Sequence, residues 1–321
     1  MTNQVNEIKM WVSNLLPREN FTIGQIAGDA SFRKYYRVKN SAKSYIVMYA
    51  PPEKEDTQIF IKISQLFANA GINVPKIIEH NEQQGLILLT DFGDDLYLYK
   101  LNSDNSHELY RDAIRSLHEI QKISATSLPE YTTNLLVQEM ELFTQWYLKK
   151  HLSQDISANM QKLIKETHGT LVKSALEQPA VTVHRDYHSR NLIYTNKRNP
   201  AIIDYQDAVA GPITYDLVSL LRDCYINWEE EQIINWINYY KSSAEVQSLI
   251  SGIDDKTFIK WFDYMGIQRH LKAIGIFCRL NYRDNKNFYL DDIPRTMQYI
   301  LDVSKKYPEL NKFHNLIMEL I

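Results

Sequence analysis

A short stretch near the middle of the chain places three oxygen-bearing side chains in loops between apolar runs. The run 181–183 leads into His184-Arg185-Asp186, Asn191 follows within the same loop, and a later apolar run ends at Asp204. Taken singly, an aspartate or asparagine in a loop is most often a turn or capping residue. Three of them at this spacing, between segments that look like β-strands, favour a chemical site instead.

The same spacing points to one kind of chemistry. Transfer of a phosphoryl group needs a carboxylate that orients and deprotonates the attacking hydroxyl, and oxygen ligands that hold Mg²⁺ against a triphosphate. The arrangement H-R-D-x-x-x-x-N, followed by a further aspartate, supplies both. It predicts Asp186 as the catalytic base, Asn191 and Asp204 as ligands of Mg²⁺, and ATP as the phosphoryl donor.

Two further residues near this loop are predicted to be structural. His184 directly precedes the predicted catalytic stretch, where packing or a hydrogen bond would fix the loop. Asp216 opens a predicted helix, where a carboxylate stabilises exposed backbone N–H groups. Arg185 is expected to form a local ion pair, because the chain shows no segment resembling a phosphorylated activation loop.

Composition narrows the class of protein. The 321 residues include 44% hydrophobic and 23% charged residues, which is typical of a globular protein with a core divided over two lobes. The net charge of −3 gives no sign of nucleic-acid binding. Only two cysteines are present, and no secretion signal or run long enough to span a membrane is seen. A cytoplasmic protein is expected, without a membrane or an obligate protein partner.

Hydrophobic periodicity divides the chain into an N-terminal α+β part and a helical remainder. The N-terminal part is predicted to hold five strands and two helices, one of which begins at Asp56 or Thr57 and stops at Gly71. The strands are expected at 21–26, 34–38, 44–49, 76–78 and 86–89, and the first helix at 5–16. Helices are expected at 106–123, 134–151, 155–177, 216–225, 229–245, 255–280, 291–304 and 309–320, with short strands at 180–183, 192–195 and 201–204.

These motifs together resemble the aminoglycoside phosphotransferase family, which shares the protein-kinase-like fold. The resemblance rests on the catalytic loop, on the stretches 28–37 and 204–217, and on Gln268-Arg269-His270-Leu271-Lys272. It implies a bilobal α+β fold with a five-stranded antiparallel N-lobe at 1–89, a hinge at 90–97 and a mainly helical C-lobe at 98–321. Within the family, the chain is most similar to bacterial anomeric sugar kinases.

The resemblance implies transfer of the γ-phosphoryl group of ATP to the C1 hydroxyl of N-acetylmuramate or N-acetylglucosamine, a step in peptidoglycan recycling. Two alternatives stay open. The acceptor could be an aminoglycoside, choline or homoserine, although cationic acceptors favour carboxylates or aromatic cages over the basic helix at 268–279. The chain could also be a nucleotide-binding pseudokinase, although the set Asp186, Asn191 and Asp204 argues against this.

The nucleotide end departs from the usual kinase pattern. The strand 44–49 carries no lysine to hold the phosphates, and Lys62 stands near the place of the usual partner glutamate. Arg33 and Lys34, beside the loop that contains Ser31, are the nearest substitutes, unless they are solvated charges at a strand edge. Asp91-Phe92-Gly93 lies far before the catalytic loop, so it is interpreted, with Thr90, as a hinge whose backbone contacts adenine.

Basic residues in the helical part are the candidates for substrate binding. Arg269 and Arg279 lie in the predicted helix 255–280, and Arg222 lies in the helix after Asp216. The lactyl carboxylate of N-acetylmuramate suits the two-pronged guanidinium group of arginine. Asp207 could be a supporting carboxylate, a sugar contact or a turn residue. Each basic residue could also belong to a solvated helix surface.

Overall fold

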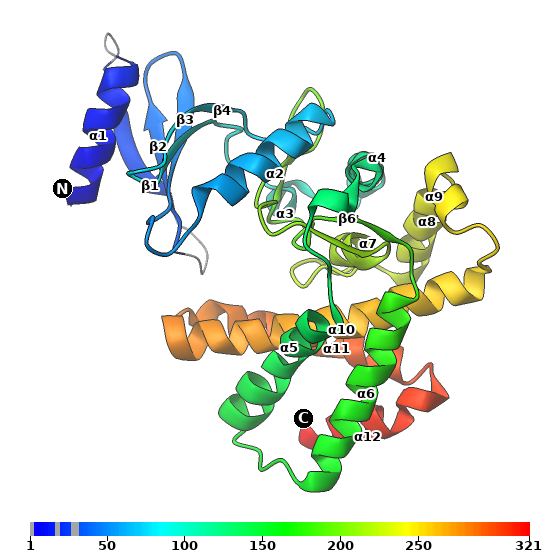
Figure 1. Cartoon of the computed structure of the whole chain (residues 1–321). Coiled ribbons are helices and arrows are strands. Elements are labelled where there is room, and N and C mark those ends of the chain that lie inside the picture. The colour runs from blue at the N-terminus through cyan, green and yellow to red at the C-terminus, as the bar shows by residue number, and fades with distance from the viewer. Residues whose placement is uncertain (1–2, 17–19, 27–31) are drawn as a thin grey trace. The chain divides into compact units, whose positions relative to one another are not determined.

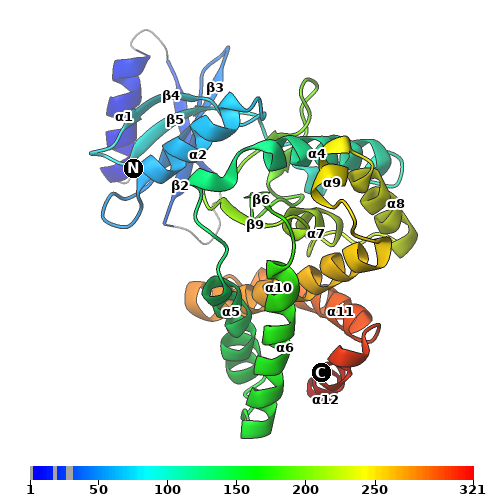
Figure 2. The ribbon, with the colours of Figure 1, turned by 45° about the vertical axis from the view of Figure 1, so that its right-hand side comes forward.

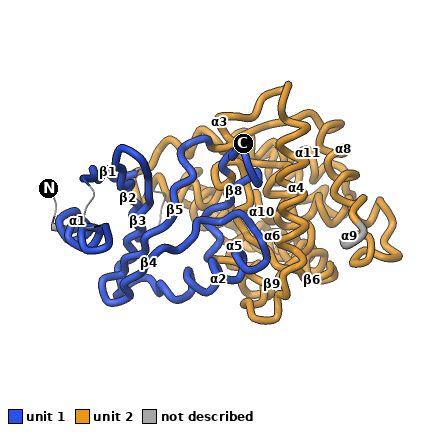
Figure 3. The backbone as a smooth tube through the Cα atoms, turned by 90° about the horizontal axis from the view of Figure 1, so that it is seen from above, with its two compact units in different colours: residues 1–95, 193–206 blue, residues 96–192, 207–321 orange. Residues whose placement is uncertain are grey.

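The computed structural model describes residues 3–16, 20–26 and 32–321. The chain forms two compact units, of which the first comprises Met1–Asp95 with Ile193–Gln206 and the second Leu96–Leu192 with Asp207–Ile321 (Figure 3). The predicted division kept 193–206 within the C-terminal lobe. The segment that carries Asp204 therefore belongs to the N-terminal unit by its contacts.

A five-stranded antiparallel sheet forms the centre of the first unit, as predicted. Its strands are β1 (Thr22–Ile26), β2 (Lys34–Lys39), β3 (Ser44–Tyr49), β4 (Ile77–Asn81) and β5 (Leu86–Thr90), in the order β1-β2-β3-β5-β4. Helix α1 (Asn3–Leu15) and helix α2 (Thr57–Asn69) lie on opposite sides of the sheet (Figure 1). The sheet is thus apolar on both faces, which explains why β5 is a continuous apolar run instead of an alternating one.

The local sequence explains which face of α1 is buried and where α2 begins and ends. In α1, Ile8 and Val12 are fully buried against β2, β3 and β5, which follows from their one-turn spacing. Helix α2 begins where predicted, because the Asp56 carboxylate accepts a hydrogen bond from Gln58 N at 2.8 Å. It ends before Gly71, whose φ of +83° is readily adopted by glycine.

The segment 193–206 is fixed to the first unit by aromatic packing and backbone hydrogen bonds. The Tyr205 ring packs against Phe60 and Phe67 of α2, with 5.5 Å between ring centres in both cases. Its hydroxyl also bonds to Ser64 Oγ at 3.1 Å. Strand β8 (Ala201–Ile202) is attached through Ile202 N, which donates to Asn73 O at 2.8 Å.

The second unit is mainly helical and is built around the 30-residue helix α10 (Asp255–Asp284) (Figure 2). This helix packs against α5 (Thr133–Leu142), α6 (Ala158–Leu176), α7 (Tyr215–Leu221) and α11 (Ile293–Ser304). The remaining helices are α3 (Tyr97–Lys100), α4 (Ser106–Lys122), α8 (Glu230–Lys241), α9 (Ala244–Leu249) and α12 (Asn311–Leu320). Within the described residues, none of the helices is both long and apolar enough to cross a membrane.

The structure differs from the predicted elements in several places, among them the short helix α3, which was not predicted, and α7, which ends at Leu221 instead of 225. The helix expected at 134–151 changes to a π-helix over Phe143–His151, and the helix expected at 229–245 is divided by a break at Ser242–Ser243 into α8 and α9. Strand β9 (Val209–Pro212) was not predicted. It contains Gly and Pro, residues that are depleted in strands, and it is recognised only by pairing with β6 (Ala180–Val183).

Candidate active site

The catalytic loop leaves the two-stranded sheet of β6 and β9. Val183, the last residue of β6, pairs with Val209 of β9, and the next residue, His184, is fully buried. The His184 ring lies edge-on to Tyr187 at 5.6 Å, and its Nδ1 accepts a hydrogen bond from Asp186 N at 3.3 Å. These contacts are those that a structural histidine would make.

Asp216 holds the backbone of this loop. Its carboxylate accepts hydrogen bonds from His184 N at 2.6 Å and from Arg185 N at 3.0 Å. Burial raises the pKa of Asp216 to about 7, and the nearby Asp186 adds to the increase while the two backbone N–H groups oppose it. Asp216 therefore acts from the start of α7 on the residues directly before Asp186.

A second aspartate, Asp223, supports the far side of the loop and was not predicted. Its carboxylate accepts hydrogen bonds from Ser189 N and from Tyr225 N, both at 3.0 Å. Asn191 closes the loop by donating from Nδ2 to Asp186 O at 2.9 Å. Its Oδ1 is then the side-chain atom that suits a metal ion.

The donor set fits Mg²⁺ chemically. This ion takes oxygen ligands and is usually held by one or two carboxylates together with substrate phosphates and water. Amide and carboxylate oxygens, such as those of Asn191 in the second unit and Asp204 in the first, are ligands of this kind. The described residues contain no cluster of three or more His, Cys, Asp or Glu side chains suited to a metal. Asp204 itself has φ +65° and accepts a hydrogen bond from Gln206 Nε2 at 2.9 Å.

Cations gather around Asp186 within the second unit. Burial acts to raise the pKa of Asp186, but Lys272, Arg269 and Arg185, together with His188, outweigh it and leave the pKa below its usual value. Asp186 is therefore ionised near neutral pH, as a base that accepts a hydroxyl proton must be.

Arg269 is a buried arginine of the second unit; burial acts to lower its pKa, but Cys224, Tyr215, Asp186 and Asp223 together raise it. It is only 6% exposed, and its hydrogen-bond contact is Cys224 Sγ at 3.8 Å. Among the described residues, no carboxylate lies within ion-pair distance of it. A buried guanidinium group that has five donors and such weak partners is suited to binding an anion.

Arg222 does not have the environment expected of a substrate residue. It is 2% exposed and forms ion pairs with Asp263 at 2.7 Å and with Glu230 at 3.1 Å. The charge of Arg222 is thus neutralised by these two carboxylates, which argues against the predicted role in substrate binding. The sequence pattern could not show this, because Asp263 is 41 residues away.

The surroundings of Arg279 and Asp207 do not point to one role. Arg279 is half-buried, and burial lowers its pKa. It lies ten residues beyond Arg269 on the same helix, a separation of about 15 Å along the axis. The Asp207 side chain is exposed, while its backbone oxygen accepts a hydrogen bond from Arg185 Nη1 at 3.4 Å.

The predicted nucleotide residues lie in the first unit. Arg33 pairs with Glu55 at 2.9 Å and also contacts Tyr35, whose pKa burial raises and Asp204 raises further. Arg33 and Asp204 therefore act on a common neighbour, Tyr35. Lys34 is exposed and bonds to Gln4 Oε1 at 3.3 Å, while Ser31 lies outside the described residues.

The residues of the predicted hinge are tied to the sheet. The Asp91 carboxylate binds Arg37 Nε at 2.7 Å, Ser44 Oγ at 2.5 Å and Gly93 N at 2.9 Å. A carboxylate with these partners is poorly placed to serve as a metal ligand, which agrees with the choice of Asp204. Thr90 Oγ1 accepts from Lys76 N at 2.9 Å, and Phe92 is partly buried.

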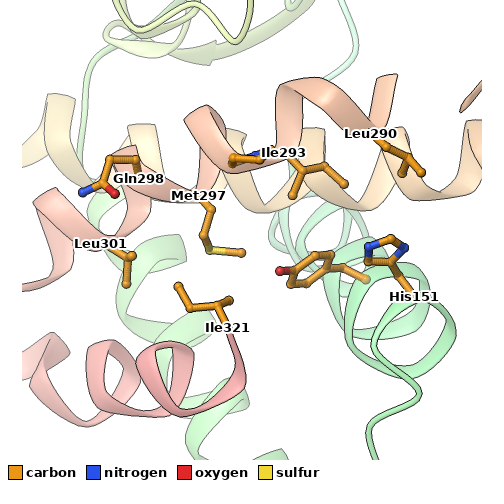
Figure 4. A pocket seen from close by; sticks show the side chains of 9 residues that line it. His151, Leu290, Ile293, Met297, Gln298, Leu301 and Ile321 are labelled. Atoms are coloured by element: carbon orange, nitrogen blue, oxygen red, sulfur yellow. The ribbon is translucent and has the colours of Figure 1, made fainter. Parts of the chain in front are cut away.

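A separate cavity of about 420 Å³ lies in the second unit, between the π-helix, α11 and the C-terminal residue (Figure 4). Its lining is mainly apolar and comprises Tyr147, His151, Leu290, Ile293, Pro294, Met297, Gln298, Leu301 and Ile321. None of these is a predicted site residue. None of the lining side chains is a carboxylate.

Sequence comparison gives the chain its relatives. It matches the profile of the Phosphotransferase enzyme family over residues 22–249. It is 38% identical over 321 residues to the N-acetylmuramate/N-acetylglucosamine kinase of Neisseria meningitidis, covering 98% of this chain and 95% of that protein. It is 39% identical over 295 residues to the protein of the same name from Pseudomonas aeruginosa, covering 92% of this chain and 87% of that protein.

Solved structures give the same fold. The choline kinase LicA from Streptococcus pneumoniae matches with a TM-score of 0.66 and 14% identity, covering 94% of this chain and 100% of that one. The ADP-bound aminoglycoside phosphotransferase APH(2'')-Ib matches with a TM-score of 0.61 and 14% identity, covering 91% and 97%. The family predicted from the motifs is confirmed: the chain belongs to the phosphotransferase enzyme family.

Proposed function

We propose that the protein is an ATP-dependent kinase that transfers the γ-phosphoryl group to the anomeric C1 hydroxyl of N-acetylmuramate, N-acetylglucosamine or both. The observation that carries this proposal is the 38–39% identity, over more than nine-tenths of the chain, to relatives with that name. The proposed product, a sugar 1-phosphate, is a precursor for nucleotide-sugar synthesis in peptidoglycan recycling. The use of ATP agrees with the cytoplasmic location expected from the sequence.

Asp186 is proposed as the base. Its carboxylate is ionised, and the loop that carries it is held from both sides by Asp216 and Asp223. It would orient the C1 hydroxyl and accept its proton as the oxygen attacks the γ-phosphorus. Asn191 and Asp204 are proposed as ligands of Mg²⁺, which neutralises the developing charge on the phosphate oxygens when it is bound.

Arg269 is proposed to contact the acceptor. It is a buried cation near Asp186, and the hydrogen-bond contact of its guanidinium group is the weak one to Cys224 Sγ at 3.8 Å. N-acetylmuramate carries a lactyl carboxylate, which a guanidinium group binds through two parallel hydrogen bonds. Arg279 stays a secondary candidate on the same helix, and Asp207 a candidate for a hydroxyl of the sugar.

The nucleotide is proposed to bind in the first unit. The backbone at Thr90, Asp91 and Phe92 would contact adenine, as the hinge does in kinases. Arg33 is the better candidate for the missing lysine, because it is partly buried and shares Tyr35 with Asp204. Lys34 is exposed, and Ser31 stays a candidate on sequence position alone.

A phosphorylation screen tests the proposal. The chain is incubated with ATP, Mg²⁺ and one of four acceptors: N-acetylmuramate, N-acetylglucosamine, choline or kanamycin. We expect ADP and a sugar phosphate with the first two only, because the cations around Asp186 disfavour a cationic acceptor. Phosphorylation of choline or kanamycin alone would refute the acceptor, and release of no ADP with any of them would favour a pseudokinase.

A further inference from the structure

Glu139, on α5, forms the centre of a buried polar cluster in the second unit. It is 6% exposed, and its two carboxylate oxygens contact four side chains. Oε1 binds Arg185 Nη2 at 2.5 Å and Lys272 Nζ at 3.0 Å. Oε2 accepts from Gln268 Nε2 at 3.2 Å and from the Tyr131 hydroxyl. Both oxygens of one carboxylate are thus used to hold groups from three segments, namely the catalytic loop, helix α10 and the residues before α5.

The charges of this cluster extend to the catalytic base. Burial raises the pKa of Glu139, but Lys272 and Arg185 outweigh it, so Glu139 stays ionised between two cations. Burial lowers the pKa of Lys272, but Tyr215, Glu139 and Asp186 outweigh it, so Lys272 stays charged. Its Nζ also contacts the Tyr215 hydroxyl at 3.1 Å. Lys272 is therefore a buried cation held by Glu139 and Tyr215, and its charge also acts on Asp186.

Arg185 connects the cluster to Asp186 through the chain itself. Its φ is +79°, in the left-handed region that residues other than glycine adopt only at an energetic cost. The conformation is imposed by Asp216, which holds the Arg185 N–H, and by Glu139, which holds its guanidinium group. The Tyr131 ring lies 5.6 Å below that group. Because Asp186 is the next residue, its direction depends on how Arg185 is held.

We infer that Glu139 is a positioning residue for phosphoryl transfer: its carboxylate fixes Arg185 and Lys272, and through them orients Asp186. The inference rests on the proposed kinase activity. In many kinases the arginine of this motif is held by a phosphate on the activation loop. Here a carboxylate of the same unit supplies the counter-charge permanently, so the loop needs no modification to become ordered.

The simpler alternative is that Glu139 only neutralises buried charge. The two roles respond differently to Glu139→Asp, which keeps the charge but draws the carboxylate back by one methylene group. A purely charge-balancing residue would leave kcat unchanged. A positioning residue would lower it, because displacement of catalytic groups by about 1 Å can cost on the order of a hundredfold in rate.

The experiment measures kcat, both KM values and the thermal midpoint for Glu139→Asp, Glu139→Gln and the double variant Glu139→Gln/Lys272→Met. The double variant removes one positive and one negative charge, so the cluster keeps its charge balance if the single Gln variant does not fold. Glu141→Asp and Glu141→Gln are the matched controls. They lie on the same helix, where Glu141 contacts His168 at 3.6 Å and none of the cluster residues.

We expect Glu139→Asp and the double variant to lose about tenfold or more in kcat, with KM for ATP within about threefold of the wild type. The Glu141 controls should be unchanged. Wild-type kcat in Glu139→Asp, or in a folded double variant, would overturn the inference. Absence of activity in the wild type with every acceptor is a different result, since it refutes the proposed function itself.

Discussion

The loop that carries Asp186 and the segment that carries Arg33 are built in opposite ways. The loop is held by buried carboxylates, with Asp216 and Asp223 on its backbone and Glu139 on Arg185. Arg33 forms an ion pair with Glu55 in which both side chains are partly exposed. The loop that carries the proposed base is thus held by buried carboxylates, while the ion pair of Arg33 lies nearer to solvent. Substitutions should therefore have larger effects in the loop than at the nucleotide end.

Asp186→Asn should give the largest effect. The amide cannot accept the hydroxyl proton, so kcat should fall by about 10²–10⁴-fold, the usual contribution of a positioned base. Binding of ATP, measured by calorimetry, should be unchanged. A kcat within twofold of the wild type would show that Asp186 is not the base.

Arg222→Met tests the correction made for that residue. Removing Arg222 leaves the buried Asp263 carboxylate with only the Tyr307 hydroxyl at 2.8 Å and the more distant Lys306 at 3.9 Å, and should cost about 3 kcal/mol in the free energy of unfolding. Denaturant unfolding measures this loss. If Arg222 bound substrate instead, its substitution would leave the free energy of unfolding unchanged and would raise the KM for the acceptor.

His270 gives the stability of the second unit a pH dependence. Burial lowers its pKa from 6.5 to about 3, and Arg269 and Arg222 add to this, although the ring's bond to Arg222 O opposes it. The unfolded chain then binds a proton that the folded chain does not, so stability is complete above about pH 6.5 and falls as pH decreases toward 3. The His270→Gln variant should lose less stability than the wild type between pH 7 and pH 5, which thermal melts measure. An equal loss in both would contradict this origin.

Arg33→Ala and Lys34→Ala form a matched pair with the smallest expected effects. Arg33→Ala should remove one charge-assisted hydrogen bond to phosphate. Such a bond contributes about 1.5–3 kcal/mol before solvent screening reduces it, so the KM for ATP should rise by about tenfold. Because Lys34 is exposed, Lys34→Ala should change the KM for ATP by less than twofold. Equal effects of the two substitutions on the KM for ATP would show that Arg33 does not contact the phosphates.

Sequence alone predicted the parts that depend on local pattern. The catalytic loop, the five strands and the start of α2 at Asp56 each follow from residues that are neighbours in the chain. The buried ion pair of Arg222, which argues against the predicted substrate role, could not be predicted because its partner, Asp263, is distant in sequence. Glu139 was missed for the same reason, although one signal was available. It lies between Leu136 and Met140 on the buried side of α5, where a carboxylate needs a partner.

Phosphorylation of an N-acetyl amino sugar at C1 is tested by the identity of the product. N-acetylmuramate is incubated with ATP and Mg²⁺, and the product is studied by phosphorus NMR. We expect one new phosphorus signal coupled to the anomeric proton, formed in equal amount to ADP and absent with Asp186→Asn. A phosphate on any other hydroxyl, or ADP formed without a sugar phosphate, would contradict it.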